Sequence, residues 1–394
     1  MKIRSIHPFP ARMAPELALR SLSRLPEGSR VLDPMSGSGT VLRQALALGH
    51  QAVGFDMDPL AVLMSRVWTS PVDPDGVIRE LDEVVAEAQD VDLRCESLAW
   101  QDDETRQFVR YWFAPVQRRA LSRLAIVFAR RRRARLGPAR RAAVDLLQVA
   151  LSRTIVTKEQ CASLARDTSH SRPHRVADDN DYDVWAGFRR SVLAVLDRLS
   201  DHEINRAAEV HLGDARRIAL PEGSADFILS SPPYLNAIDY MRGHRLSLVW
   251  LGYSLQQLRA IRSDTIGAER AGVPSDERIV ERIARAMCDT DALSSRHVAM
   301  VGRYAADLFG MMSETARVLA ADGRAVFVVG NSCLRGQFIS NDRGVAQAGR
   351  RAGLRLVHRT ERDLPQASRY LPVTAHGSLS KRMRTETVLT FAHA

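Results

Sequence analysis

A turn rich in glycine and serine, set between two short apolar runs, is the feature that most constrains the fold of this chain. Both apolar runs, Arg30–Asp33 and Gln51–Asp56, end in an aspartate. The turn, Pro34–Thr40, is followed by a stretch of helical character over residues 41–48. This order of strand, glycine turn, helix and strand opens a doubly wound α/β sheet.

The remaining strands of this sheet are predicted late in the sequence. They are Glu209–Leu212, Ala225–Leu229, Arg324–Gly330, Leu354–His358 and Glu386–Phe391. Helices are predicted over Val77–Ala88, Thr105–Arg135, Pro138–Thr157, Tyr182–Ser200 and Ile238–Leu251, with one or two more within Ser275–Ala320. We therefore expect a mostly parallel sheet built from residues 1–68 and 209–394, interrupted by a mostly helical insertion at residues 69–208.

The composition is typical of a soluble globular protein, with 45% hydrophobic and 26% charged residues. No run approaches the roughly 20 apolar residues that a membrane span needs, and residues 1–30 lack the apolar core of a secretory signal. The four cysteines are far apart and form no C-x-x-C pair, so we expect neither a disulfide framework nor a metal site. A reduced, cytoplasmic setting fits this cysteine usage.

The net charge of +10 is concentrated in one segment. Residues 106–175 contain 17 Lys and Arg, 16 of them Arg, against three acids, whereas the remaining chain has 39 basic and 43 acidic residues. A GC-rich codon bias explains arginine in place of lysine, but it does not explain the clustering. A solvated helical surface is the alternative to the interpretation that we favour, which is contact with a polyanion such as nucleic acid.

The glycine turn has the features of a cofactor loop, because glycine lets a ligand approach the backbone closely. Leu42 stands where a dinucleotide-binding G-x-G-x-x-G motif needs its third glycine, and no phosphate-binding G-x-x-x-x-G-K-[ST] motif occurs. Asp33 directly before the turn suits a cationic group, and Asp56 after the second strand suits ribose hydroxyls. Together they favour S-adenosylmethionine, although an ordinary tight strand-to-helix turn would look similar.

Three motifs resemble those of the amino-methylating DNA methyltransferases. The run Asp33-Pro34-Met35-Ser36-Gly37-Ser38-Gly39-Thr40 resembles their cofactor loop. Ser231-Pro232-Pro233-Tyr234 resembles their catalytic tetrapeptide in the S-P-P-Y form that is typical of cytosine-N4 enzymes, and His7–Met13 resembles the segment before their first strand. The resemblance covers residues 6–58 and 211–240, and it implies the seven-stranded methyltransferase sheet as the catalytic domain.

The resemblance assigns catalysis to the tetrapeptide Ser231, Pro232, Pro233 and Tyr234. The Ser231 hydroxyl and the Pro232 carbonyl would accept hydrogen bonds from the target amine, which stabilises charge that develops in the transition state. Consecutive prolines fix the backbone and remove competing N–H donors. Tyr234 would stack on a base that has been flipped out of the duplex. Alternatively, the two prolines only end a strand and Tyr234 belongs to the core.

The expected cofactor-binding residues are Phe9, Pro10, Asp33, Pro34, Ser36, Gly37, Ser38, Gly39, Thr40, Asp56 and Asp214. Asp214 follows a strand and would accept a hydrogen bond from the adenine amine, unless it only caps a helix. Phe9 and Pro10 would pack on the methionine portion, unless they only pack on the N-terminal segment. Asp239 would line the base pocket or merely add polarity to a loop.

Target recognition is expected in the insertion, residues 69–208. The residues predicted to contact DNA are Arg130, Arg131, Arg132, Arg133, Arg172 and Arg175. A rival location is Arg259–His297, after the tetrapeptide.

The resemblance implies a site-specific enzyme that methylates the N4 amine of cytosine in double-stranded DNA, in a restriction-modification or epigenetic system. A cognate restriction endonuclease is one candidate partner, and we expect the protein in the cytoplasm with the nucleoid. Adenine-N6 methylation of DNA stays open, although it usually has Asp at the position of Ser231. Amino-methylation of RNA and a catalytically silent DNA-binding protein are more remote alternatives, the latter because Asp33 and the whole tetrapeptide are intact.

Overall fold

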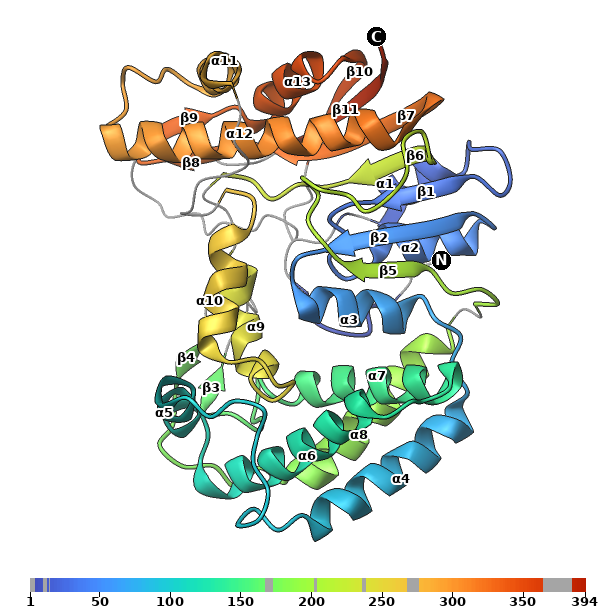
Figure 1. Ribbon diagram of the computed structural model, residues 1–394, viewed down its shortest axis with the longest axis vertical. Coiled ribbons are helices and arrows are strands. Elements are labelled where there is room, and N and C mark those ends of the chain that lie inside the picture. The colour runs from blue at the N-terminus through green and yellow to red at the C-terminus, as the bar shows by residue number, and fades with distance from the viewer. Residues whose placement is uncertain are drawn as a thin grey trace.

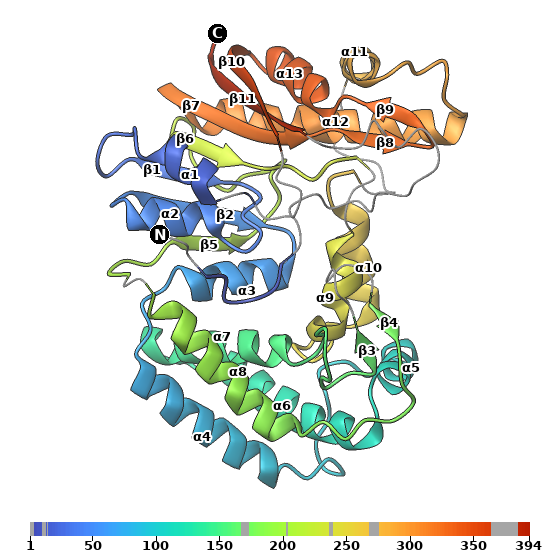
Figure 2. The same cartoon turned by 180° about the vertical axis from the view of Figure 1, so that it is seen from behind.

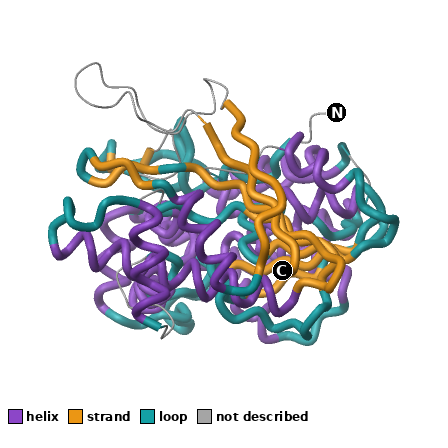
Figure 3. Tube along the Cα trace, turned by 90° about the horizontal axis from the view of Figure 1, so that it is seen from above, coloured by secondary structure: helices purple, strands orange, loops and turns teal. Residues whose placement is uncertain are grey.

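The computed structural model describes residues 4–9, 13, 15–166, 173–201, 204–235, 239–267, 276–363 and 385–394. A sheet with helices on both faces forms one half of the molecule, and a layer of helices forms the other half (Figures 1 and 2). Seen from above, the strands run through the middle of the sheet half with helices around them (Figure 3).

The sheet has seven strands in the order β10-β11-β7-β6-β1-β2-β5. Their bounds are β1 Arg30–Asp33, β2 Gln51–Asp56, β5 Glu209–Leu212, β6 Ala225–Ser230, β7 Leu319–Gly330, β10 Leu354–Asp363 and β11 Thr385–His393. Strands β5, β2, β1, β6 and β7 pair in parallel, whereas β11 runs antiparallel to both β7 and β10. The predicted fold class, a mostly parallel, doubly wound seven-stranded sheet, is confirmed.

Successive side chains along a strand point to opposite faces of the sheet and pack into two hydrophobic cores. Val31 packs with α1 (Pro15–Leu22) and α2 (Thr40–Ala47) on one face. Leu32 packs on the other face with α11 (Glu277–Met287), α12 (Ser295–Val318) and α13 (Asn341–Arg351). This period of two follows from the pleat of a strand. Helix α3 (Pro59–Trp68) carries residues of the α1–α2 core and of the core of the helical half, so it joins the two halves.

The insertion is mostly helical, as expected, but its second predicted helix is two helices. The helices of the insertion are α4 Pro74–Asp90, α5 Asp103–Trp112, α6 Pro115–Arg133, α7 Pro138–Arg153 and α8 Val184–Leu199. Phe113 and Ala114 are extended, because Pro115 disfavours helical geometry in the residue before it and cannot donate to the preceding turn. The single helix predicted over Thr105–Arg135 is therefore wrong at this point.

Two helices that follow β6 pack onto the insertion. They are α9 (Tyr240–Leu248) and α10 (Leu255–Asp264), and the sequence pattern predicted only the first. Trp250 between them lies edge-on to Phe113 at 5.0 Å between ring centroids, and the Trp100 indole donates to the Val249 carbonyl at 2.6 Å. The helical half is thus completed by chain from beyond the insertion.

Short hairpins were also missed. Strands β3 (Ala165–Arg166) and β4 (His174–Arg175) form one pair, and β8 (Ser332–Leu334) and β9 (Gln337–Ile339) form another. Two or three residues are too few to show a periodic pattern. Within the described residues, no helix has both the length and the apolar character needed to cross a membrane.

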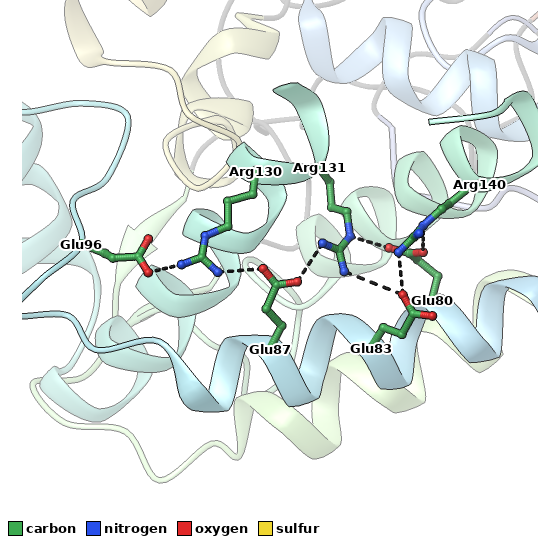
Figure 4. A network of polar contacts seen from close by, with 7 residues as sticks. All are labelled: Glu80, Glu83, Glu87, Glu96, Arg130, Arg131 and Arg140. Atoms are coloured by element: carbon green, nitrogen blue, oxygen red, sulfur yellow. Dashed lines mark hydrogen bonds and ion pairs between the residues drawn. The ribbon is translucent and has the colours of Figure 1, made fainter. Parts of the chain in front are cut away.

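An ion-pair network ties α4 to α6 and α7 (Figure 4). Glu80 is buried, and its two oxygens accept from the Nε atoms of Arg131 and Arg140 at 2.7 and 2.6 Å. Glu87 pairs with Arg131 and with Arg130, both at 2.7 Å. Glu80 and Glu87 lie two turns apart on α4, so they share the face that meets the two basic helices.

The network engages two of the four consecutive arginines of α6 that are predicted to contact DNA. Arg130 also pairs with Glu96, so it and Arg131 are neutralised within the insertion. The guanidinium of Arg132 lies against Gly252, where an added Cβ would be 2.6 Å from its Nη2. Arg132 and Arg133 are both exposed, and their contact with DNA stays a prediction. Arg131 is mostly covered, and leaving it there without carboxylates would be costly, so Arg130 and Arg131 serve to hold the helices of the insertion together.

Replacing Glu80 with Ala should destabilise the protein by about 3 kcal/mol, because it removes the buried carboxylate that pairs with both Arg131 and Arg140. Glu83→Ala is the matched control, since Glu83 is 56% exposed and an exposed pair contributes less than about 1 kcal/mol. Urea unfolding followed by circular dichroism measures both. Equal losses in the two variants would contradict the structural role of Glu80.

Candidate active site

The strand order creates a crevice at the carboxyl ends of β1 and β6. The chain leaves β1 toward β2 on one side and returns to β6 on the other, and ligands of open α/β sheets bind at such a switch point. A pocket opens there. Its lining includes Phe9, Met13, the turn residues Asp33, Pro34, Met35, Ser36, Gly37, Ser38 and Thr40, then Asp56, Met57, Asp58, Gly213, Ala215, Ser231, Pro233, Asp239, Tyr240, Arg262, Thr265 and Ile266.

The glycine turn forms one wall, and its two glycines are required by geometry. Gly37 and Gly39 have φ values of 51° and 88°, which favour glycine. A Cβ on Gly37 would lie 3.1 Å from the Phe9 ring, and one on Gly39 would lie 2.9 Å from the Ser65 hydroxyl. Gly39 therefore serves the packing of α2 on α3, whereas Gly37 lets Phe9 cover the turn.

Two buried carboxyl groups border the pocket. Asp33 accepts from the Ser230 hydroxyl at 2.7 Å, and burial raises its pKa to about 7. Asp56 accepts from the amides of Gly37 and Asp58 at 2.8 and 2.9 Å, and burial raises its pKa to about 6. Burial disfavours the charged forms of both groups. Within the described residues, neither carboxyl group accepts a hydrogen bond from a cationic side chain. A cation bound beside either group would therefore stabilise its carboxylate.

A polar atom and an aromatic cover complete this end of the pocket. Ser38 is buried, and its hydroxyl has no hydrogen-bond partner within the described part of the chain. Phe9 stacks on Tyr240 at 5.1 Å, with the two rings 15° from parallel. Buried polar groups normally find partners, so the Ser38 hydroxyl is available to a ligand that lies between the turn and the aromatic cover.

A hydrogen bond that no sequence motif predicts holds this cover. His244 of α9 pairs through Nδ1 with Asp58, which also caps α3 by accepting from the Leu60 amide at 2.9 Å. The His244 ring lies 5.6 Å from that of Phe9. The pair thus fastens α9, and with it Tyr240, to the start of α3.

The tetrapeptide lies directly after β6, opposite the glycine turn. The Ser231 hydroxyl donates to the Val328 carbonyl at 3.0 Å, and its oxygen is also within hydrogen-bond reach of the Tyr234 side chain. The hydroxyl of Tyr304, a fully buried residue of α12, donates to the Pro233 carbonyl at 2.9 Å. Tyr304 lies far from the tetrapeptide in the sequence, and only the packing of α12 on the sheet reveals it.

Tyr234 is not among the residues that line the pocket, and its predicted stacking on a base stays a prediction. Its ring packs against the core, and its hydroxyl lies 3.5 Å from Glu386, a residue that Arg362 holds at 2.6 Å. Burial, followed by the Glu386 carboxylate, raises the pKa of Tyr234 well above its usual value. Ser231 and Pro233 line the pocket, whereas the aromatic rings on its wall are those of Phe9 and Tyr240.

Asp214 has a protein partner, and its predicted contact with the adenine amine stays a prediction. Its carboxylate accepts from Arg216 at 2.8 Å, and Arg216 also pairs with the buried Asp307 of α12. Its neighbours Gly213 and Ala215 form the pocket wall in its place. The predicted hydrogen bond from an adenine amine would therefore compete with a guanidinium that already holds both Asp214 oxygens.

Of the other predicted site residues, most line the pocket and a few do not. Phe9, Asp33, Pro34, Ser36, Gly37, Ser38, Thr40 and Asp56 all line the pocket. Pro10 and Arg172 lie outside the described residues. Arg175 lies on β4, paired with Asp178 at 3.0 Å.

No family model matches the chain. Segments of it are similar to two Type II methyltransferases. M.MvaI of Kocuria varians is 35% identical over 82 residues, which are 20% of this chain and 18% of that protein. M.MjaII of Methanocaldococcus jannaschii is 33% identical over 66 residues, 16% of this chain and 12% of that protein. The matched segments thus span less than a fifth of either relative.

Solved methyltransferase structures align over most of the chain with low scores. The alignment with a TehB-like SAM-dependent methyltransferase from Corynebacterium glutamicum covers 97% of this chain and 89% of that chain, at 10% identity and a TM-score of 0.31. The rRNA methyltransferase aviRa from Streptomyces viridochromogenes covers 98% and 87%, at 12% identity and a TM-score of 0.32. At these values the matches say nothing about substrate.

Proposed function

We propose that this protein is an S-adenosylmethionine-dependent DNA methyltransferase that methylates an exocyclic base amine, and that the amine is N4 of cytosine. The observation that carries the proposal is the meeting of the glycine turn and the S-P-P-Y tetrapeptide at one pocket, although they are about 190 residues apart in the sequence. The similarity of segments of the chain to two Type II methyltransferases supports it.

The pocket chemistry fits the cofactor. Asp33 would offer a carboxylate to its ammonium group, Asp56 and the Ser38 hydroxyl would offer acceptors to its hydroxyl groups, and Phe9 would cover it from the N-terminal side. When bound, the cofactor would supply an electrophilic methyl group on a sulfonium. The buried carboxyl groups would hold the cofactor in place, and the aromatic cover would keep water from it.

The tetrapeptide addresses the weak nucleophilicity of a base amine. Its nitrogen lone pair is delocalised into the ring, so acceptors directed at its hydrogens favour the geometry in which the lone pair can attack. The Ser231 oxygen, whose own proton is directed to Val328, would accept one hydrogen bond from the amine. The Pro232 carbonyl would accept the other. Tyr304 holds the neighbouring Pro233 carbonyl, which positions the tetrapeptide without occupying the Pro232 oxygen.

Ser231→Ala should lower kcat by a factor that corresponds to about 2–4 kcal/mol in the barrier, as for the loss of one preorganised hydrogen-bond partner. Cofactor affinity should stay unchanged. Ser224→Ala, in an exposed turn, is the matched control.

Mass spectrometry of nucleosides from treated DNA identifies the product of the wild type. N4-methylcytosine is expected; N6-methyladenine would overturn the cytosine assignment and keep the mechanism. Full activity of Ser231→Ala would remove the catalytic role from the tetrapeptide.

Cofactor affinity should fall as pH drops below about 7. The raised pKa of Asp33 means that this group is protonated at lower pH and then no longer attracts a cation. One proton is released on binding in that range, so the affinity should change by up to about tenfold per pH unit. Calorimetry between about pH 5.5 and 8.5 measures this. Asp33→Asn should bind weakly and lose most of the dependence, and a flat profile in the wild type would rule out Asp33 as the ammonium partner.

Tyr304→Phe should lower kcat about tenfold, because it removes the hydrogen bond that holds the Pro233 carbonyl while leaving the ring in the core. KM for DNA and cofactor affinity should stay close to the wild-type values, a split that a general loss of stability would not produce. Tyr182→Phe, in the insertion, is the control. An unchanged kcat in Tyr304→Phe with normal thermal unfolding would contradict the positioning role.

A further inference from the structure

We infer that duplex DNA is held along a basic path that runs from the pocket mouth over α9 and α5 to β4. The path consists of four arginines and two aromatic residues: Arg262, Arg242, Arg245, Phe108, Tyr111 and Arg175. This inference rests on the proposed function, and it places the DNA on a surface different from the arginine run of α6.

The path begins at the mouth of the pocket. Arg262 of α10 and Asp239 both line the pocket, and the Arg262 Nε lies 2.9 Å from an Asp239 oxygen. Arg242 is exposed on the first turns of α9, and Arg245 follows one turn later. Burial, then the positive charge of Arg242, lowers the pKa of Arg245, to which Arg262 also contributes. Three guanidinium groups thus lie near one carboxylate, which leaves an excess of positive charge beside the opening.

In the middle of the path, the guanidinium group of Arg245 lies over the aromatic ring of Phe108. The Arg245 Cζ lies 5.2 Å from the centre of the Phe108 ring of α5. Its Nε is buried and has no hydrogen-bond partner within the described residues. A cation on an aromatic face keeps its charge while its plane is fixed, so Arg245 is held in place by Phe108 and not by a carboxylate.

The far end repeats this arrangement. The Arg175 Cζ of β4 lies 4.9 Å from the centre of the Tyr111 ring, and Tyr111 is 52% exposed. Phe108 and Tyr111 are three residues apart on α5, so they lie on the same face of the helix. Arg175 also pairs with Asp178. The two arginine–aromatic pairs therefore continue one another along α5.

The elements that carry the path are neighbours on one side of the molecule. Helices α9, α10 and α5 and the β3–β4 hairpin lie together in both views, on the side toward which β1, β2 and β6 point (Figures 1 and 2). A flipped base must enter from the carboxyl ends of these strands. DNA that follows the path would therefore pass the pocket mouth.

The charges favour this surface over the arginine cluster at the end of α6 and the start of α7. On the path, Asp239 and Asp178 oppose four arginines, whereas Glu80, Glu83, Glu87 and Glu96 surround Arg130, Arg131 and Arg140. The nearby Glu104 is taken by Arg259. Guanidinium groups that alternate with aromatic rings suit a phosphate backbone and unstacked bases.

The test compares two double variants. Arg242→Gln/Arg245→Gln removes two charges from the path, and Arg133→Gln/Arg135→Gln removes two exposed charges at the end of α6, away from the path. Fluorescence anisotropy with a labelled duplex, over a range of salt concentrations, gives affinity and salt dependence. Each lost phosphate contact should reduce the log–log salt slope by about 0.9. We expect a reduction of about 1.8 for the path variant, little change for the control, and unchanged cofactor affinity in both.

Arg242→Gln alone, at an exposed position, and Arg175→Gln extend the test to variants that should fold normally, and each should reduce the slope by about 0.9. Wild-type slopes in all path variants would overturn the path and leave the proposed function intact, provided that the wild type binds and methylates DNA. Equal losses in the path and control variants would also overturn it. A wild type that binds RNA in preference to DNA, or methylates no DNA, would overturn the proposed function and the path together.

Discussion

The hydrogen bond from Ser230 to Asp33 joins the carboxyl ends of β1 and β6, where the two halves of the doubly wound sheet meet. Asp33 begins the glycine turn and Ser230 directly precedes the tetrapeptide. One buried contact therefore sets the distance between the glycine turn and the tetrapeptide. The same contact supports a carboxyl group whose pKa burial raises to about 7. Burial destabilises the ionised form of this carboxyl group, so a bound cation would stabilise it more strongly than it would an exposed one.

Positioning comes from parts of the chain that carry no motif. Tyr304 of α12 holds the Pro233 carbonyl, and His244 of α9 holds Asp58 at the start of α3. Both side chains are buried, and both connect a helix that follows the tetrapeptide to a wall of the pocket. Helix α12 lies in the sheet half and α9 belongs to the helical half, so the pocket is fixed from both sides. Preorganisation of this kind lets polar groups act without first having to rearrange.

Arginine has two physical roles in this molecule. In the α4–α6–α7 network, guanidinium groups are neutralised by glutamates and hold helices together (Figure 4). Along α5 and α9, Arg245 and Arg175 lie on aromatic rings, and a surplus of positive charge remains. Composition counts both kinds equally, which is why a charge total alone pointed to the arginine run of α6.

The sequence by itself determined the fold class and predicted many of the residues that line the pocket. Strand periodicity, the glycine turn and the aspartates at strand ends depend on residues close together in the chain, so local patterns were sufficient to single out Asp33, Asp56 and Ser231, which the fold brings to one pocket. The tertiary structure decided which charges are free, where Tyr234 and Asp214 direct their polar groups, and that Tyr304 and His244 belong to the site. These are pairings between distant segments, and their partners are chosen by packing and burial, which no local pattern encodes.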